Sequence, residues 1–180
     1  MGILVVEKDT PGLTWEHTWK DALSLRASDS HDVCLENVVV PLENLIDTAQ
    51  APKPNIWFPL IMAGVYMGTA VAARNAVIQF ALERIPTALG KPITTLPKIQ
   101  RQIGEIDVAL QAAQALLFAV AGEWTGKNED RDAFLPRIAA AKSMVTETAN
   151  LVTDQALRIA GGTSITKALP LERYFRDVRA

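Results

Sequence analysis

Apolar residues follow two different periods along the chain. Up to residue 48 they form short β-branched runs, at residues 2–7 and 33–40, with the turn signal Pro11-Gly12 between them, which is typical of strands. From Asn55 onward they recur every three or four residues in alanine-rich sequence, which is typical of α-helices. The change of period is marked by Pro41, Pro52 and Pro54. We therefore expect a β segment over residues 1–50 and a helical domain over residues 51–180.

The helical region predicts three long helices. The first covers about residues 56–84, where Pro86 ends it, and the second about residues 97–123. The third starts near Asp132, after a polar loop at residues 128–130, and the glycine pair Gly161-Gly162 ends it. The last two helices each carry one apolar stripe: Ile103, Ile106, Leu110, Ala113, Leu117 and Val120 in the second, and Ile138, Val145, Ala149, Val152, Ala156 and Ile159 in the third. The expected fold class is mainly α, an up-down helical bundle preceded by a short β segment, with a fourth helix beginning at Leu171.

Residues 56–73 form an uncharged stretch long enough to be weighed as a membrane span. Within it, Gly64 and Gly68 have the spacing of a membrane-helix dimer motif. Pro59, the many small residues and a helical pattern that continues to Glu83 favour a different structure. We expect a helix that is apolar all round because it lies inside a soluble bundle, and no membrane span.

Composition narrows the classes of function. The 180 residues are 49% hydrophobic, which is enough for a folded domain with a sizeable core. The 18 basic and 20 acidic residues are scattered, so no basic surface for nucleic acid is indicated. The single cysteine, Cys34, excludes an internal disulfide, and with only His17 and His31 beside it no zinc site is expected. Cys34 lies in an apolar run and is expected to be buried, and a cytoplasmic location fits this cysteine usage.

Landmarks in a fixed order resemble the acyl-CoA dehydrogenase family. Residues 25–29, 33–41 and 43–45 are similar to the end of that family's middle β-domain and its hinge into the helical domain. Arg84, near the end of the first long helix, stands where the family has an arginine for the flavin. The tail is similar to the family's glycine pair and the run that follows it, at Gly161, Gly162, Pro170, Glu172, Arg176 and Asp177. The resemblance covers the whole chain, with residues 51–180 as a C-terminal bundle domain that stops before its end.

The resemblance implies a fold, a reaction and partners. Family members have an N-terminal helical domain, a middle β-domain and a C-terminal helical bundle, and they form homodimers or homotetramers with FAD at the subunit interface. A glutamate removes the α proton of an acyl-CoA while the β hydride passes to the flavin, and an electron-transfer flavoprotein takes the electrons. The implied protein is a flavoprotein oxidoreductase that acts on CH–CH groups in fatty acid metabolism.

By this resemblance four residues are expected at the FAD site: Arg84, Leu89, Gly161 and Gly162. An arginine offers two parallel donors to a pyrophosphate, and glycine lets a backbone approach a phosphate without a Cβ in the way. Each has a plainer interpretation, Arg84 as a solvated residue in the last helical turn and the glycines as a helix cap. Leu89 replaces the family's aromatic residue near adenine, with four residues between it and Arg84 instead of two.

No catalytic residue is identified in the chain. Most family members carry the glutamate base just beyond the Arg-Asp pair, at a position past Ala180, and a minority carry it early in the first bundle helix, near Phe58. Neither place supplies a carboxylate here, so we expect the 180 residues alone to be inactive. Arg176 and Asp177 are interpreted as a structural pair with no catalytic role.

Two other functions stay open. A flavin-dependent monooxygenase of the same fold needs no glutamate base. Two departures from the dehydrogenase pattern favour it, the altered segment at residues 84–90 and Pro97 in place of a glutamine. A non-catalytic helical scaffold for oligomerisation is favoured by the absence of a base.

Overall fold

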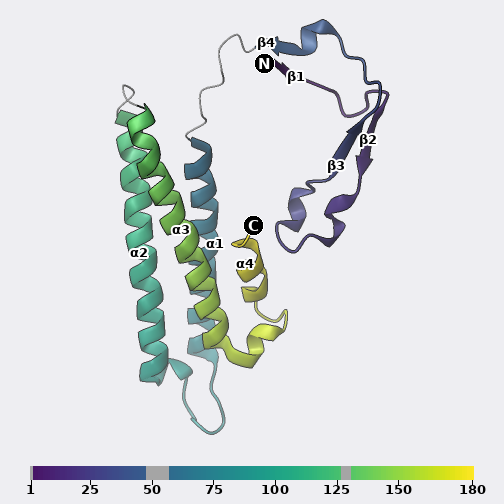
Figure 1. Ribbon diagram of the computed structural model, residues 1–180. Helices are drawn as coiled ribbons and strands as arrows, with labels where there is room; N and C mark the ends of the chain where they lie inside the picture. Colours follow the sequence, from purple (N-terminus) through teal and green to yellow (C-terminus); the bar gives the residue numbers. More distant parts are fainter. Residues whose placement is uncertain (1, 48–56, 127–130) are drawn as a thin grey trace. The chain divides into compact units, whose positions relative to one another are not determined.

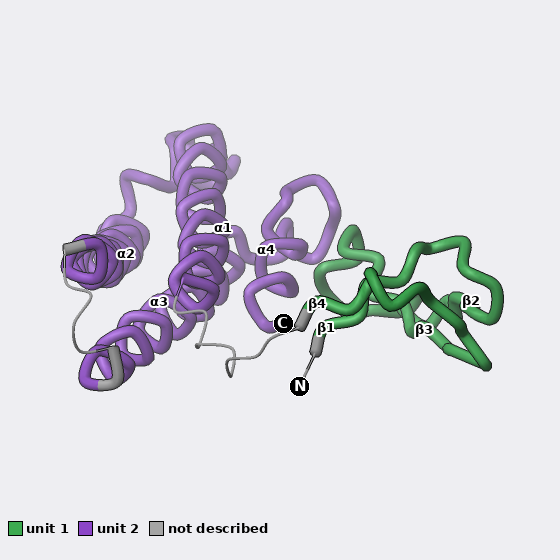
Figure 2. Tube along the Cα trace, turned by 90° about the horizontal axis from the view of Figure 1, so that it is seen from above, with its two compact units in different colours: residues 1–54 green, residues 55–180 purple. Residues whose placement is uncertain are grey.

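The computed structural model describes residues 2–47, 57–126 and 131–180. The chain forms two compact units, residues 1–54 and residues 55–180, which Figure 2 shows in different colours. The predicted boundary between residues 50 and 51, the predicted start of the first helix near Ile56 and the predicted polar loop at residues 128–130 lie outside the described residues.

The first unit contains two antiparallel strand pairs (Figure 1). β1 (Gly2–Leu4) pairs with β4 (Leu45–Asp47), and β2 (Leu13–Glu16) pairs with β3 (Asp32–Leu35). The predicted runs at residues 2–7 and 33–40 are therefore only partly strand, and the sequence pattern missed β2 and β4, which are too short to show an alternation. β3 ends at Leu35, and Asn37 soon after it has a positive φ of 51°, which breaks the extended backbone.

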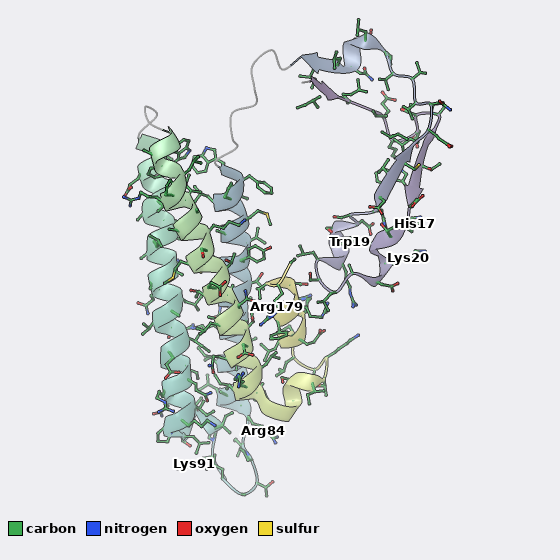
Figure 3. All side chains as sticks on the ribbon, viewed as in Figure 1. His17, Trp19, Lys20, Arg84, Lys91 and Arg179 are labelled. Carbon is green, nitrogen blue, oxygen red and sulfur yellow. The ribbon has the colours of Figure 1, made fainter. Side chains whose placement is uncertain are left out.

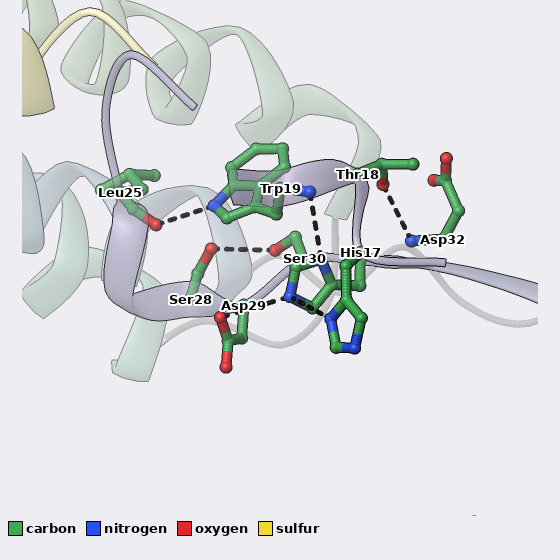
Figure 4. Close-up of polar contacts among 9 residues, drawn as sticks. His17, Thr18, Trp19, Leu25, Ser28, Asp29, Ser30 and Asp32 are labelled. Atoms are coloured by element: carbon green, nitrogen blue, oxygen red, sulfur yellow. Dashed lines mark hydrogen bonds and ion pairs between the residues drawn. The ribbon is translucent and has the colours of Figure 1, made fainter. Parts of the chain in front are cut away.

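Tight turns hold β2 and β3 in register. At the start of β2, Gly12 has a φ of +89°, and its carbonyl accepts the Glu36 N–H at 2.8 Å. A Cβ at Gly12 would collide with the Glu36 carbonyl, so this turn requires glycine. After β2 the chain enters a 3₁₀ turn, η1 (Thr18–Asp21), where the Trp19 N–H donates to His31 Nδ1 at 3.0 Å (Figure 4). This bond ties the turn to the residue just before β3.

The chain's two histidines contact each other beside this turn. His31 Nδ1 accepts a hydrogen bond, so the proton of its neutral ring lies on Nε2, which is 3.4 Å from His17 Nδ1 and 3.5 Å from Asp29 Oδ1. Among the described residues no cluster of three or more His, Cys, Asp or Glu side chains could hold a metal ion. Cys34 is exposed, so the expected buried thiol is wrong. Every residue of β3 is exposed, and neither face of this short ribbon is covered.

The second unit is an up-down helical bundle, as the apolar periodicity predicts (Figure 1). α1 (Trp57–Glu83) and α3 (Arg131–Ala160) run in one direction and α2 (Pro97–Gly126) runs in the other. The 3₁₀ turns η4 (Ile93–Thr95) and η5 (Gly161–Ile165) lie in the connections, and the short α4 (Leu171–Asp177) packs against α1 and α3. The predicted helices are confirmed to within a few residues, as is the end of the third helix at the glycine pair.

The predicted apolar stripes of α2 and α3 form the core of the bundle. All twelve residues of the two stripes are buried except Ile103, which is half-buried and packs against the others. α1 contributes mostly small side chains at the same spacing: Ala63, Ala70, Ala73, Val77 and Ala81, each fully buried. Small side chains on α1 allow the neighbouring helices to approach closely.

α1 and residues Pro97–Thr125 of α2 are long and apolar enough to cross a membrane by length and composition alone. The core helix of a bundle meets the same criteria, and in this structure both helices pack against α3 in one core. An ion pair also connects α1 and α2. Arg74 of α1 donates from Nε and Nη2 to the two carboxylate oxygens of Asp107 on α2, at 2.8 and 3.0 Å. These hydrogen bonds raise the pKa of the Arg74 guanidinium above its ordinary value.

Candidate functional site

One candidate site lies at the end of the bundle where α1 and α3 end and α2 begins. Arg84 follows α1 directly: its N–H donates to the Phe80 carbonyl at 2.9 Å, and its carbonyl accepts the Ile93 N–H at 3.0 Å. This backbone is therefore fixed, while the side chain is exposed, and within the described residues the guanidinium has no hydrogen-bond or ion-pair partner. Figure 3 shows Arg84 and Lys91 at this same end of the bundle. Lys91 is likewise exposed and has no partner in the part of the chain that the structure describes.

The predicted glycines lie at the same end, directly after α3 (Figure 1). Gly161 has a φ of +59°, the left-handed conformation of a helix cap, so the plain interpretation of this residue applies. A Cβ placed on Gly161 or on Gly162 would meet no atom within 4 Å. The space in front of this backbone is open, which leaves room for a ligand to approach it.

Leu89 lies differently from the other three predicted residues. Its side chain is half-buried and packs against the core, and its N–H donates to the Pro86 carbonyl at 2.9 Å. The side chain therefore supports the connection between α1 and α2, and its contact with adenine stays a prediction. Next to it Gly90 has a φ of +67°, which turns the chain back toward α2.

The charges at this end suit an anionic group. Arg84 and Lys91 have no counter-ion in the described residues, whereas the nearby Glu83 accepts a hydrogen bond from Gln79. Two cations without a counter-ion in the described residues, at the same end of the bundle as an open glycine backbone, suit a pyrophosphate. The residues present therefore fit the phosphate part of a dinucleotide.

A second candidate site is a groove of ≈ 330 Å³ beside α4. Its walls come from α1, α3 and the residues that follow α4: Phe58, Met62, Tyr66, Lys142, Thr146, Asn150, Val178, Arg179 and Ala180. Tyr66 donates its hydroxyl to the Ala180 carbonyl at 2.8 Å, which holds the end of the chain against α1. Figure 3 shows Arg179 where α4 ends.

This groove brings together the two places where the resemblance positions a catalytic base. Phe58 marks the place early in the first bundle helix, and Ala180 precedes the place beyond the Arg-Asp pair. The two residues are 122 positions apart in the sequence, yet both line the groove. No aspartate or glutamate is among its described lining residues, so this lining supplies no carboxylate base.

Arg176 of α4 forms an ion pair within its own helix. Arg176 Nε donates to Glu172 at 2.8 Å, one helical turn away, and this bond raises the pKa of the Arg176 guanidinium. The negative charge of Asp177 also raises this pKa. The pair of Arg176 and Glu172 is local to one helix. The absence of a catalytic role for Arg176 and Asp177 stays a prediction.

The groove and the basic end of the bundle are far apart. Tyr66 and Arg84 are 18 residues apart on α1 and its last turn, so about 27 Å separates them along the helix axis. No single side chain can reach both features.

Two charged residues at these sites escaped the sequence analysis. Lys91 was not predicted because the cofactor residues were taken from family motif positions, and Lys91 is not one of them. Its place directly after Gly90, in the connection between two helices, was the available signal. Lys142, Thr146 and Asn150 follow one another at four-residue spacing, and this polar stripe along one face of the helix was the available signal.

The sequence matches the family described as acyl-CoA dehydrogenase, C-terminal domain, over residues 60–180. YdbM of Bacillus subtilis (strain 168), an acyl-CoA dehydrogenase by name, is 39% identical over 182 residues, which are 99% of this chain and 47% of YdbM. The mitochondrial short-chain specific acyl-CoA dehydrogenase of Mus musculus is 30% identical, over 97% of this chain and 42% of its own length. The chain thus spans less than half the length of these two relatives.

Solved structures show the same architecture. Dibenzothiophene monooxygenase TdsC from Paenibacillus sp. A11-2 superposes with a TM-score of 0.81 at 26% identity, over 97% of this chain and 50% of TdsC. A glutaryl-coenzyme A dehydrogenase in complex with glutaryl-CoA superposes with a TM-score of 0.77 at 25% identity, over 98% of this chain and 45% of that one. The family match contains nearly all of the bundle, from Leu60 to Ala180. On these grounds the chain belongs to the acyl-CoA dehydrogenase family.

Proposed function

We propose that this chain is part of an FAD-dependent acyl-CoA dehydrogenase, which introduces a double bond between the α and β carbons of an acyl-CoA thioester. The observation that supports this most is the groove beside α4, because it is lined by Phe58, near which one family position for the base falls, and by Ala180, which precedes the other. Its volume of ≈ 330 Å³ is at the lower end of the range for small-molecule pockets and suits one acyl chain.

The residues of the groove would bind and orient the acyl group. Phe58, Met62 and Tyr66 on α1 form an apolar wall for a hydrocarbon chain. The bond between Tyr66 and the Ala180 carbonyl would hold the residues after α4 against the wall that α1 forms. We expect the 180 residues by themselves to be inactive, since the described groove lining has no carboxylate to take the α proton.

FAD is the proposed cofactor, and when bound it accepts the hydride from the β carbon. Arg84 and Lys91 would hold its pyrophosphate, and the open backbone at Gly161 and Gly162 would lie against it. Because about 27 Å separates Arg84 from the groove, we infer that the basic end serves a cofactor whose flavin ring lies in another subunit. A flavin ring in another subunit requires an oligomer, so we propose a homodimer or a homotetramer. An electron-transfer flavoprotein as the electron acceptor and a cytoplasmic location are two further proposals.

Protein expressed from the intact reading frame tests this function. Acyl-CoA-dependent reduction of a dye is the expected activity, together with a flavin absorbance spectrum. The 180-residue chain provides the control, and it should reduce no dye with the same acyl-CoA. An intact protein that retains flavin but is not reduced by any acyl-CoA would exclude the dehydrogenase.

A flavin-dependent monooxygenase is the second candidate. The likeness to TdsC over 97% of this chain favours it, as does the connection after Arg84, where Pro86 accepts the capping hydrogen bonds from Leu89 and Gly90. Hydroxylation of an aromatic substrate that depends on reduced flavin and oxygen, with no reduction by acyl-CoA, is the outcome that selects this function.

A non-catalytic scaffold is the third candidate, and it predicts a colourless protein. Intact protein that purifies without flavin, and that gains no flavin absorbance after incubation with FAD, would support the scaffold. It would also leave the unpaired cations at the bundle end without a ligand.

A further inference from the structure

The groove beside α4 has two walls of different chemistry. The wall from α1 is apolar, with Phe58 and Met62, and carries one hydroxyl at Tyr66. The wall from α3 is polar, and its three residues, Lys142, Thr146 and Asn150, are four positions apart along one face of the helix. A ligand that fills this groove must therefore be amphipathic.

The polar groups of α3 differ in whether they are already satisfied. Thr146 Oγ1 lies 3.1 Å from the Lys142 carbonyl and 3.0 Å from the Ser143 carbonyl, and Asn150 Nδ2 donates to the Thr146 carbonyl at 3.0 Å. These two side chains are bonded to their own helix. The ammonium of Lys142 is exposed and has no hydrogen-bond or ion-pair partner among the described residues.

Two neighbouring grooves beside α3 are lined by charged residues of opposite sign. Glu147 and Asp154 line the other groove, of ≈ 510 Å³, and Asn150 lies in both. The charged residues that line the groove beside α4 are both cations, Lys142 and Arg179. This separation favours an anionic ligand group in the groove beside α4.

Only one of these two cations is available to a ligand. The guanidinium carbon of Arg179 lies 3.5 Å from the centre of the Phe175 ring in α4, and the same guanidinium donates to the Phe175 carbonyl. Arg179 is therefore already engaged with its own helix. Lys142 is left as the cation that can pair with a ligand.

We propose that Lys142 determines specificity in this groove by pairing with an anionic group of the ligand while the ligand's apolar part lies on the α1 wall. The proposal rests on the function proposed above, in which the ligand is an acyl-CoA thioester. An acyl-CoA can supply the anion in two ways, as a phosphate of its CoA part or as a carboxylate at the far end of a dicarboxylic acyl chain. Both are bound by the same chemistry, an ammonium at the edge of an apolar groove.

The test compares three thioesters with the protein from the intact reading frame. Butyryl-CoA has phosphates and no free carboxylate, glutaryl-CoA has phosphates and one free carboxylate, and butyryl-pantetheine has neither group. The variants are Lys142→Ala and Lys142→Arg. Arg137→Ala is the matched control, because Arg137 is also a cation of α3 but pairs with Glu123 at 2.9 Å and does not line the groove.

The expected result is a change in KM with little change in kcat. Lys142→Ala should raise KM by about three- to tenfold for the thioester whose anion it binds, which is the range for one charge-assisted contact at a partly exposed site. Lys142→Arg should restore most of the loss, Arg137→Ala should leave KM unchanged, and added salt should reduce the difference. A CoA phosphate as the anion predicts weaker binding of both CoA thioesters, whereas an acyl carboxylate predicts weaker binding of glutaryl-CoA alone.

Two results would overturn the role of Lys142. One is a change of less than about twofold in KM for all three thioesters, and the other is an equal loss for butyryl-pantetheine. If no acyl thioester reduces the dye, the proposed function fails by itself. Calorimetric titration of glutaryl-CoA and CoA into wild-type and Lys142→Ala protein then still decides whether Lys142 binds an anion.

Discussion

The substitution Ile106→Ala tests whether the long apolar helices stack as one bundle. Ile106 of α2 is fully buried and is among the largest fully buried side chains of the core. Val108, two residues further along the same helix, is 70% exposed. A bundle predicts very different costs for truncating these two side chains, whereas a lipid-facing helix has no such buried face.

The cost of Ile106→Ala in unfolding free energy can be worked out from the burial of the Ile106 side chain. Ile106→Ala removes three buried carbons, worth about 2.4 kcal/mol at about 0.8 kcal/mol each, and leaves a cavity that adds to this cost. Alanine is the better helix former by about 0.4 kcal/mol, which offsets a small part. The expected loss in the free energy of unfolding is about 2–4 kcal/mol. Val108→Ala should change it by less than about 0.5 kcal/mol, because most of this side chain already contacts solvent.

Urea unfolding followed by far-UV circular dichroism measures both variants. The α-helices of the described residues all lie in the second unit, so the signal reports the bundle rather than the strand pairs. With a slope of about 2 kcal/mol per molar urea, Ile106→Ala should lower the midpoint by about 1–2 M at an unchanged slope. Equal shifts for the two variants, or a loss below about 1 kcal/mol for Ile106→Ala, would refute the packing of α2 described above.

Three further predictions use the same unfolding assay or flavin absorbance. Asp107→Asn should cost about 1–2 kcal/mol of unfolding free energy, because it removes the two-fold hydrogen bonding with Arg74 across α1 and α2 at a site about one-third exposed; a double-mutant cycle with Arg74→Ala that shows no coupling would contradict this. Arg84→Ala should leave the unfolding free energy unchanged and weaken FAD retention by intact protein about tenfold, and full retention of flavin would remove Arg84 from the site. Gly161→Ala should cost about 1 kcal/mol because of its φ of +59°, and Gly162→Ala, which lacks a positive φ, should cost clearly less.

The helices could be predicted because each one buries a stripe of its own sequence. Val145 and Val152 of α3 recur every seven residues, and this spacing alone places them on one face. Strands of three or four residues leave no such record, so β2 and β4 were missed. The expected burial of Cys34 was wrong because an apolar run in a strand is buried only where another layer covers it, and every residue of β3 is exposed.

The sequence by itself determined the helices, their ends and the position of Arg84 at the end of α1, because these depend on residues close together in the chain. Only the tertiary structure decided that Phe58 and Ala180 share one groove, that Lys142 stands in it without a partner among the described residues, and that Arg84 lies about 27 Å away along α1. Such relations depend on how α1, α3 and α4 pack. A periodic pattern specifies which face of a helix is buried, but not which neighbour covers it.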